Sequence, residues 1–383
     1  MLISPVCKRC LVTRSSLGAV SASLMVLVGA YLLGPVAPGA KHTALSAAEP
    51  REEDVPDDGE GSRSLGDLDE AVKQQLANGR FRQAFEAQQA LVEKLSQTLG
   101  AEAGVVRYGK AYQESLGRLA SLNGSKAHAA KDAMTGCFTA LRLRDRGDLI
   151  GARRKCRRAC AILETLLEDD DVVRIDALFT FGEIEHQIGN LRAARAHFST
   201  SVKGTQKVLG NQGHEYALAV ASLGKVELDL AFLAEAKIHL EEARKIWSAP
   251  ATRHTSRLVT TWFNLAMLES AREDHAAVEV CAKAGIAAAL EDLENAGGSY
   301  SLCRLELISS LLDQKKLKEA AQYCREVVEE LESGDAIFSA SEAASLYEFQ
   351  GFALRSLNEL EAAAQSDAKA DLLRQGLQEE SEG

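Results

Sequence analysis

A fixed period of 42 residues constrains this chain more than its composition does. The period is marked by a first position, usually leucine, followed three residues later by a second that is usually alanine, at steps of 42, 42, 42, 42 and 43 residues. The six pairs are Leu149 and Ala152, Leu191 and Ala194, Leu233 and Ala236, His275 and Val278, Leu317 and Ala320, and Leu360 and Ala363. Such periods are typical of repeat arrays, in which each unit buries its apolar face against its neighbours. We therefore expect a solenoid, a class that more often binds proteins than performs chemistry.

Each period has the pattern of two helices joined by a turn. Around Ala194, apolar residues at helical spacing run over 177–184, Gly189 and Asn190 interrupt them, and a second helix begins at Leu191. Small residues recur where paired helices must approach closely, at Gly182, Gly224, Ala266 and Gly351. An acidic residue recurs three positions after the small one, at Glu185, Glu227 and Glu269. We interpret these carboxylates as hydrogen-bonding groups between helices, not as catalytic acids.

The pattern of these periods is a large residue, then Leu-Gly, then alanine after the turn. This pattern resembles the tetratricopeptide repeat (TPR). The minimal TPR has 34 residues, so this chain adds about one helical turn to each helix, as in repeats of the kinesin-light-chain type. Six units cover 125–380, and a weaker one lies in 65–124 with an extra helix near 106–122. The predicted fold class is all-α: a right-handed TPR-like α-solenoid of six to seven helix hairpins, preceded by a single apolar N-terminal segment.

The N-terminal residues have the pattern of a targeting region. Residues 1–16 are basic and free of acidic side chains, 17–37 are apolar and long enough for one transmembrane helix, and 38–64 form an acidic linker. A cleaved secretory signal peptide, a mitochondrial presequence and an uncleaved signal-anchor each fit part of this pattern. We favour a mitochondrial address with a retained inner-membrane anchor, with the secretory pathway or an outer-membrane signal-anchor as alternatives.

This order of parts resembles mitochondrial TPR proteins that support respiratory complex III. The resemblance implies a membrane-anchored scaffold that binds protein clients and serves as an assembly or maintenance factor for a membrane complex. The alternative is a signal-anchored, cytosol-facing receptor or adaptor at the mitochondrial outer membrane or the endoplasmic reticulum.

The charge balance argues against nucleic-acid binding. The chain has a net charge of −11, and beyond residue 48 it holds 40 basic and 55 acidic residues, whereas phosphate contacts require a basic surface. One basic patch opposes the trend and comprises Arg142, Arg144, Arg146, Arg153, Arg154, Lys155, Arg157 and Arg158. It is either a docking surface for an acidic partner or a solvated helix face, because Ala152, Cys156 and Ala159 take the core positions between these residues.

No catalytic or metal-binding motif is present. The sequence lacks a phosphate-binding glycine loop, a His-Glu-x-x-His zinc motif and a nucleophile elbow. Of its eight cysteines, Cys156 and Cys160 have no histidine at matching spacing nearby, Cys7-x-x-Cys10 is an isolated pair, and Cys156 and Cys324 occupy repeat core positions. We therefore expect no catalytic residues, no metal and no cofactor.

The partner is expected to bind on the first helix of each hairpin, which lines a concave groove in the TPR superfamily. By repeat position, the inward residues are Asp176, Thr180, Glu183, Ser222, Lys225, Phe263, Asn264, Met267, Glu306 and Phe349. This mixed surface suits a peptide or helix with apolar anchors, although some of these residues could instead pack between repeats. Heat-shock chaperone tails are an unsuitable ligand, because only Asn264 matches the family's carboxylate-binding clamp and three acidic residues oppose it.

Overall fold

The computed structural model describes residues 64–334, 336 and 338–382. The predicted basic segment 1–16, the apolar segment 17–37 and all of the linker except residue 64 lie outside the described residues, so the membrane anchor stays a prediction. Within the described ranges, no helix combines the length and the hydropathy needed to cross a bilayer.

Every regular element in the described part of the chain is helical, and the helices group into two compact units. The boundary between the units along the chain falls between Asn211 and Gln212. Unit 1 holds α3 (Leu65–Ala77), α4 (Phe81–Leu99), α5 (Gly104–Ala120), α6 (Gly124–Asp145), α7 (Leu149–Leu166), α8 (Val172–Ile188) and α9 (Leu191–Leu209). Unit 2 holds α10 (His214–Asp229), α11 (Leu233–Ser248), α12 (Thr255–Ala271), α13 (His275–Leu290), α14 (Ser299–Asp313), α15 (Leu317–Ser333), α16 (Ala340–Ser356) and α17 (Leu360–Glu382), with short 3₁₀ turns at Pro250–Thr252 and Leu293–Asn295.

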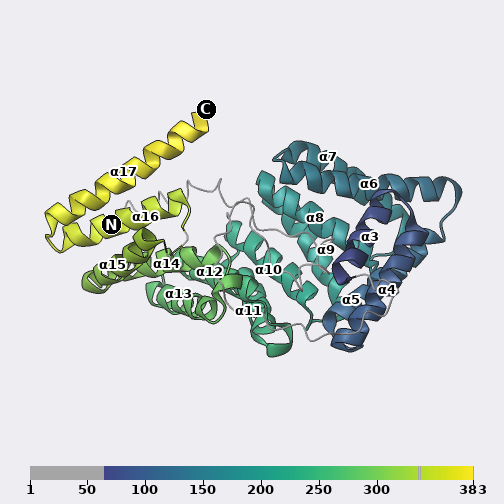
Figure 1. Ribbon diagram of the computed structural model, residues 1–383, viewed down its shortest axis with the longest axis horizontal. Helices are drawn as coiled ribbons and strands as arrows, with labels where there is room; N and C mark the ends of the chain where they lie inside the picture. Colours follow the sequence, from purple (N-terminus) through teal and green to yellow (C-terminus); the bar gives the residue numbers. More distant parts are fainter. Residues whose placement is uncertain (1–63, 335, 337, 383) are drawn as a thin grey trace, which may run out of the picture. The chain divides into compact units, whose positions relative to one another are not determined.

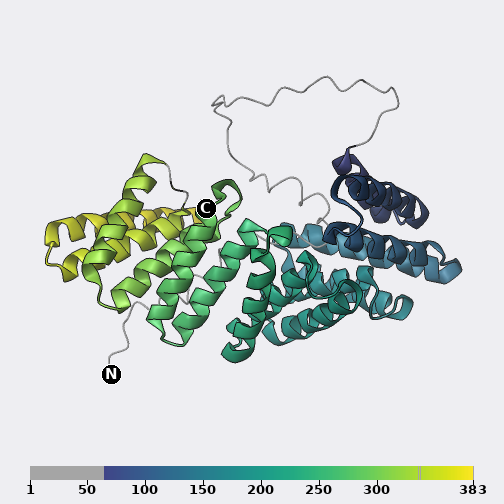
Figure 2. The same ribbon diagram turned by 90° about the horizontal axis from the view of Figure 1, so that it is seen from below.

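Consecutive helices pair as hairpins within each unit (Figure 1). The pairs α6 with α7 and α8 with α9 pack together in unit 1, and α10 with α11, α12 with α13, and α16 with α17 do so in unit 2. Figure 2 shows the helices of unit 2 from below, stacked one after another along the chain. The all-α repeat solenoid predicted from the 42-residue period is confirmed for the described residues.

A left-handed residue two positions before each second helix explains the period. The six helices α7, α9, α11, α13, α15 and α17 begin at the six leading positions of the sequence pattern. The residues with positive φ before them are Gly147, Gly189, Ala231, Glu273, Lys315 and Asn358, and Gly79 stands in the same place before α4, with φ from 60° to 88°. This conformation ends one helix and redirects the chain into the next. Four of these residues are not glycine, which shows that the packing of each hairpin overrides the local backbone preference.

Large residues of the second helix pack against small residues of the first. A Cβ atom added to Gly182 would lie 2.9 Å from the ring of Phe198, and one added to Gly224 would lie 3.0 Å from Leu240. Phe198 and Leu240 are both buried. The interpretation of these glycines as points of close helix approach is confirmed.

Helix α5 is the extra helix expected near 106–122, and it is fastened to the start of α8. The Tyr108 hydroxyl donates a hydrogen bond to Asp176 Oδ2 at 2.6 Å, and Arg118 Nε donates to Asp171 Oδ2 at 2.8 Å. Asp171 is fully buried and also accepts from the backbone N–H of Val173 as the N-cap of α8. Two buried carboxylates of α8 therefore obtain hydrogen bonds from α5.

Candidate protein-interaction surfaces

The first helices of unit 2 repeat one pattern of exposure, which decides which predicted groove residues a partner can reach. One repeat position is held by Ser222, Asn264, Glu306 and Phe349, of which Asn264 and Phe349 are buried. The position three residues later is held by Lys225, Met267, Ser309 and Phe352, and none of these four is buried. We call this second set the accessible row. It supplies the side chains that a partner on this face of unit 2 would meet first.

Two large apolar side chains stand in the accessible row. Met267 of α12 is 38% exposed and Phe352 of α16 is 40% exposed. Both occupy the same repeat position two hairpins apart, with Ser309 of α14 at the position between them. Exposed apolar residues are common on protein surfaces, and this pair in register on the first helices is a candidate site for apolar anchors of a partner.

The remaining predicted residues of unit 2 form the polar and half-buried surroundings of the row. The Lys225 ammonium contacts Asp229 Oδ1 at 2.7 Å, so α10 presents a paired charge. Phe263 is half-buried beside Trp262, whose ring lies 4.9 Å from the Arg244 guanidinium. Phe263 therefore contributes both to packing and to the surface.

Glu306 has unusual electrostatics within this face. Burial, with a smaller contribution from the charge of Asp313, raises its pKa to about 7. Burial also raises the pKa of Asp313, which His275 partly offsets at 3.5 Å. Glu306 therefore gains charge near neutral pH, although its side chain remains partly accessible.

Replacing Glu306 with glutamine is expected to stabilise unit 2 at pH 8 by about 1–2 kcal/mol, after allowance for solvent access to the side chain. Its folded pKa of about 7 lies above the usual 4.5, so the wild-type protein loses stability as pH rises through this window. The gain should shrink towards zero at pH 5. Urea unfolding at both pH values measures it, with exposed Glu319→Gln as the control. Equal gains at pH 8 and pH 5 contradict the expectation.

In unit 1 the predicted groove residues are largely occupied by their own chain. Asp176 is fully buried and accepts the Tyr108 hydrogen bond described above. Thr180 is 2% exposed, and its hydroxyl has no hydrogen-bond partner among the described residues. Glu183, whose side chain is 11% exposed, pairs with Arg144 Nη1 at 2.9 Å. These three residues serve the packing of α5, α6 and α8 and offer little surface to a partner.

The basic patch divides into two parts with different environments. The Arg144 side chain is 7% exposed and reaches both Glu183 and Asp145. Arg153 Nε donates to Glu185 Oε1 at 2.8 Å. The other members are exposed, and they are Arg142, Arg146, Arg154, Lys155, Arg157 and Arg158.

The recurring glutamates connect neighbouring helices. Glu185 and Glu269 are buried and bind Arg153 and Lys237, which stand 32 residues earlier in the preceding second helices. Glu227 is also buried, and its carboxylate lies 2.6 Å from His239 Nδ1 on α11. The structural interpretation of these residues is confirmed by their contacts.

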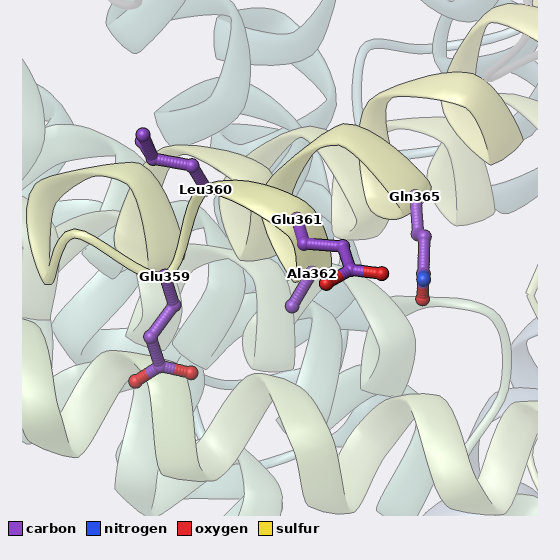
Figure 3. Close-up of a pocket in the computed structure, with 5 residues that line it drawn as sticks. All are labelled: Glu359, Leu360, Glu361, Ala362 and Gln365. Carbon is purple, nitrogen blue, oxygen red and sulfur yellow. The ribbon is translucent and has the colours of Figure 1, made fainter.

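Among the described residues, no enclosed small-molecule site stands out. The hollow in Figure 3 is lined by Glu359, Leu360, Glu361, Ala362 and Gln365. Glu359 directly precedes α17 and the other four residues lie at its start, and in the figure Leu360 and Glu359 point to opposite sides of the ribbon. A hollow formed by one turn of one helix lacks the second wall that encloses a small ligand. Across the described ranges, no three histidine, cysteine, aspartate or glutamate side chains are placed to hold a metal ion.

Sequence reasoning missed Phe352, although the length of the last repeat would have identified it. The last step of the period is 43 residues instead of 42, so the equivalent of Met267 and Ser309 falls at 352, whereas Phe349 is the equivalent of Glu306. Reasoning from sequence also missed a pair of histidines, buried His214 and half-buried His254, whose rings stack at 5.0 Å. They lie outside the repeat pattern, at the start of α10 and just before α12.

Comparisons with known proteins identify the fold. No protein-family model matches the chain, and no curated protein sequence does so either. Among solved structures, a signal transduction ATPase with numerous domains from Pyrococcus horikoshii, which has a tetratricopeptide repeat sensor, matches with TM-score 0.53 and 14% identity, covering 83% of this chain and 49% of that one. Aspartyl phosphate phosphatase F from Bacillus subtilis matches with TM-score 0.50 and 12% identity, covering 82% and 96%.

TPR-like repeats of a putative kinesin light chain from Podosopora anserina also match, with TM-score 0.47 and 15% identity, covering 53% of this chain and 96% of that one. The TPR-like fold predicted from the sequence is confirmed by the match at TM-score 0.53 to the Pyrococcus horikoshii structure with a tetratricopeptide repeat sensor. Because every identity is 15% or lower, the likeness concerns the fold alone.

Proposed function

We propose that this protein is a non-catalytic scaffold that binds a protein client on the first-helix face of unit 2. The observation that carries this proposal is the register of Met267 and Phe352, two exposed apolar side chains at one repeat position. Stacked helix hairpins hold such positions at fixed spacing, so a client segment with apolar residues at matching intervals can engage both. Lys225 and Ser309 complete the row with polar groups that favour a peptide or an amphipathic helix.

Glu306 and Asp229 add carboxylates to the same first helices, on α14 and α10. Asp229 is paired with Lys225, and Glu306 is partly charged near neutral pH, so Glu306 favours a basic residue beside the apolar anchors of the client. The sequence-based exclusion of chaperone tails rested on Asp176, Glu183 and Glu306, and the first two are occupied by Tyr108 and Arg144 in unit 1, so the exclusion stays a prediction.

For the cellular role, the support is the sequence layout of a basic leader, an apolar segment and an acidic linker. On that basis the proposed client is a subunit of a mitochondrial membrane complex during assembly or maintenance. A cytosol-facing receptor is the alternative, because an uncleaved signal-anchor accounts for the same residues.

The double variant Met267→Ser with Phe352→Ser is expected to lose at least about 90% of its specific client recovery in quantitative affinity purification of the tagged full-length chain. The physical reason is loss of two apolar anchors, each contributing about 1–2 kcal/mol to binding. Because both side chains are exposed, each substitution should change the free energy of unfolding by no more than about 0.5 kcal/mol.

The matched control is Ile238→Ser with Val280→Ser. These residues occupy equivalent positions on the second helices α11 and α13, and they are 65% and 66% exposed. The control should retain the clients of the wild type. Loss of the same clients by both variants, or by the control alone, contradicts the proposed face.

A further inference from the structure

The second helices of unit 1 carry a concentration of positive charge that is larger than the sequence patch. Helix α7 contains five basic residues and one acidic residue, Glu164, and helix α9 contains four basic residues and no acidic one. The chain as a whole has a net charge of −11. The two helices therefore form a strongly basic region in an acidic protein, and both pack against α8.

Several of these cations are already used inside the unit. Arg144 and Arg153 bind Glu183 and Glu185 of α8, as described above, and Lys207 binds Asp170 at 2.6 Å. Eight exposed cations make no ion pair with any described acidic residue, and we call them the basic surface: Arg142, Arg146, Arg154, Lys155, Arg157, Arg158, Arg192 and Lys203.

The acidic residues nearest in sequence to this surface are committed elsewhere. Asp145 is bound by Arg144 at 2.9 Å, and Asp148 caps α7 by accepting from the Gly151 N–H at 2.8 Å. Glu164 lies on the last turn of α7 and reaches towards Arg174 at 3.8 Å. The cations of the basic surface thus repel one another with little local compensation, which favours an external anion.

The geometry places much of this charge on one side of the unit. On α7, Arg154 and Arg158 are four residues apart and Arg157 lies between them, so the three share a helix face. Ile150, one turn before Arg154, is 65% exposed. By the 42-residue repeat, Arg192 on α9 is the equivalent of Ile150. Because equivalent positions of successive repeats lie on the same side of a solenoid, the α9 cations extend the same surface.

We propose that the basic surface binds an acidic segment of a partner protein, with Ile150 receiving an apolar side chain of that segment. Six of the eight cations are arginines, whose planar guanidinium groups bind carboxylates in bidentate fashion, whereas lysine acts as a point charge. An exposed isoleucine among arginines matches a peptide better than a phosphate backbone. A nucleic acid or an anionic bilayer presents a larger array of negative charge than a short acidic segment, so the negative charge of the remaining chain opposes its approach more strongly. This surface lies on unit 1 and is independent of the accessible row of unit 2.

The probe is a fluorescein-labelled 16-residue peptide of aspartate and glutamate around one leucine, titrated with the full-length chain by fluorescence anisotropy. The charge-reversal variant Arg154→Glu, Arg157→Glu and Arg158→Glu is expected to weaken binding by about tenfold or more, and wild-type binding should weaken strongly between 50 and 300 mM salt. Ile150→Ser should weaken the leucine peptide about threefold without changing the affinity for a serine version of the peptide.

The matched control reverses three exposed cations elsewhere, Lys110→Glu, Lys245→Glu and Lys318→Glu, which gives the same change in net charge. It should weaken binding less than about twofold, because long-range effects of net charge are screened by salt. The proposal is overturned by absence of peptide binding at 50 mM salt, or by equal losses in the two triple variants. It is also overturned if phosphatidylserine vesicles or duplex DNA displace the peptide and bind more tightly than it does.

Discussion

Replacing Phe198 with alanine is expected to destabilise unit 1 by about 3–5 kcal/mol, the usual cost of removing a buried aromatic side chain. Phe198 is 2% exposed, and its ring lies 5.2 Å from that of Phe179 on the paired helix α8. The ring also covers Gly182, which has no side chain to move into the space left behind. The resulting cavity therefore lies at the point where the hairpin of α8 and α9 is closest.

Urea unfolding followed by hydrogen-exchange mass spectrometry measures this effect by region. In a repeat array each hairpin is stabilised by its neighbours, so the variant should exchange faster in α8 and α9 than in the peptides of unit 2. Phe352→Ala is the control, because that ring is 40% exposed and its loss should cost less than about 1 kcal/mol. A decrease of less than about 1 kcal/mol in the free energy of unfolding of Phe198→Ala contradicts the assigned packing.

The repeat period made the fold predictable because one physical constraint recurs at each hairpin. The turn requires a left-handed residue, and the close approach of two helices requires a small one, so both leave marks at 42-residue spacing. The turn also shows where local sequence preference no longer predicts the backbone conformation. Glycine at 147 and 189 signals the left-handed backbone directly, whereas Glu273 and Lys315 adopt it only because the neighbouring helices fix the hairpin.

The surfaces were less predictable because exposure depends on contacts between segments far apart in the sequence. Repeat position placed Asp176 and Met267 in one predicted groove, yet α5 binds Asp176 while Met267 remains exposed. In the same way, Arg144 and Arg154 belong to one charged run, but only Arg144 has a glutamate of α8 within reach. Charge spacing identifies candidate binding residues, and the packing of each helix decides which of them remain available.

A stacked histidine pair in unit 2 gives the second large expected effect, a loss of stability in mild acid. His214 stacks on His254 at 5.0 Å, and the indole N–H of Trp247 donates a hydrogen bond to His214 Nδ1 at 3.3 Å. Burial, then the charges of His254 and Arg257, lowers the pKa of His214 to about 3. Burial, then Arg257, lowers the pKa of His254 to about 4. Both histidines are therefore neutral in the folded protein.

The direction of the pH effect follows from these values. Between the folded pKa values of about 3 and 4 and the usual 6.5, the unfolded chain binds more protons than the folded one. The stabilisation is fully present above pH 6.5 and is lost as pH falls, by about 3 kcal/mol for the pair at pH 5. Glu306 acts in the opposite direction, because its raised pKa favours the folded state as it becomes protonated. The histidine effect must therefore be measured as a difference between two proteins that share Glu306.

The suitable pair is the wild type and the double variant His214→Gln with His254→Gln. At pH 7.5 the variant should be less stable, since it loses packing around Trp247. At pH 5 only the wild type has two histidines that are protonated in the unfolded chain and neutral in the folded one, so its advantage should shrink by about 3 kcal/mol. Tryptophan fluorescence in urea measures unit 2 selectively, because both tryptophans of the chain, Trp247 and Trp262, lie there. His128→Gln, an exposed site on α6, should follow the wild-type pH profile, whereas parallel profiles for the wild type and the double variant contradict a neutral histidine pair.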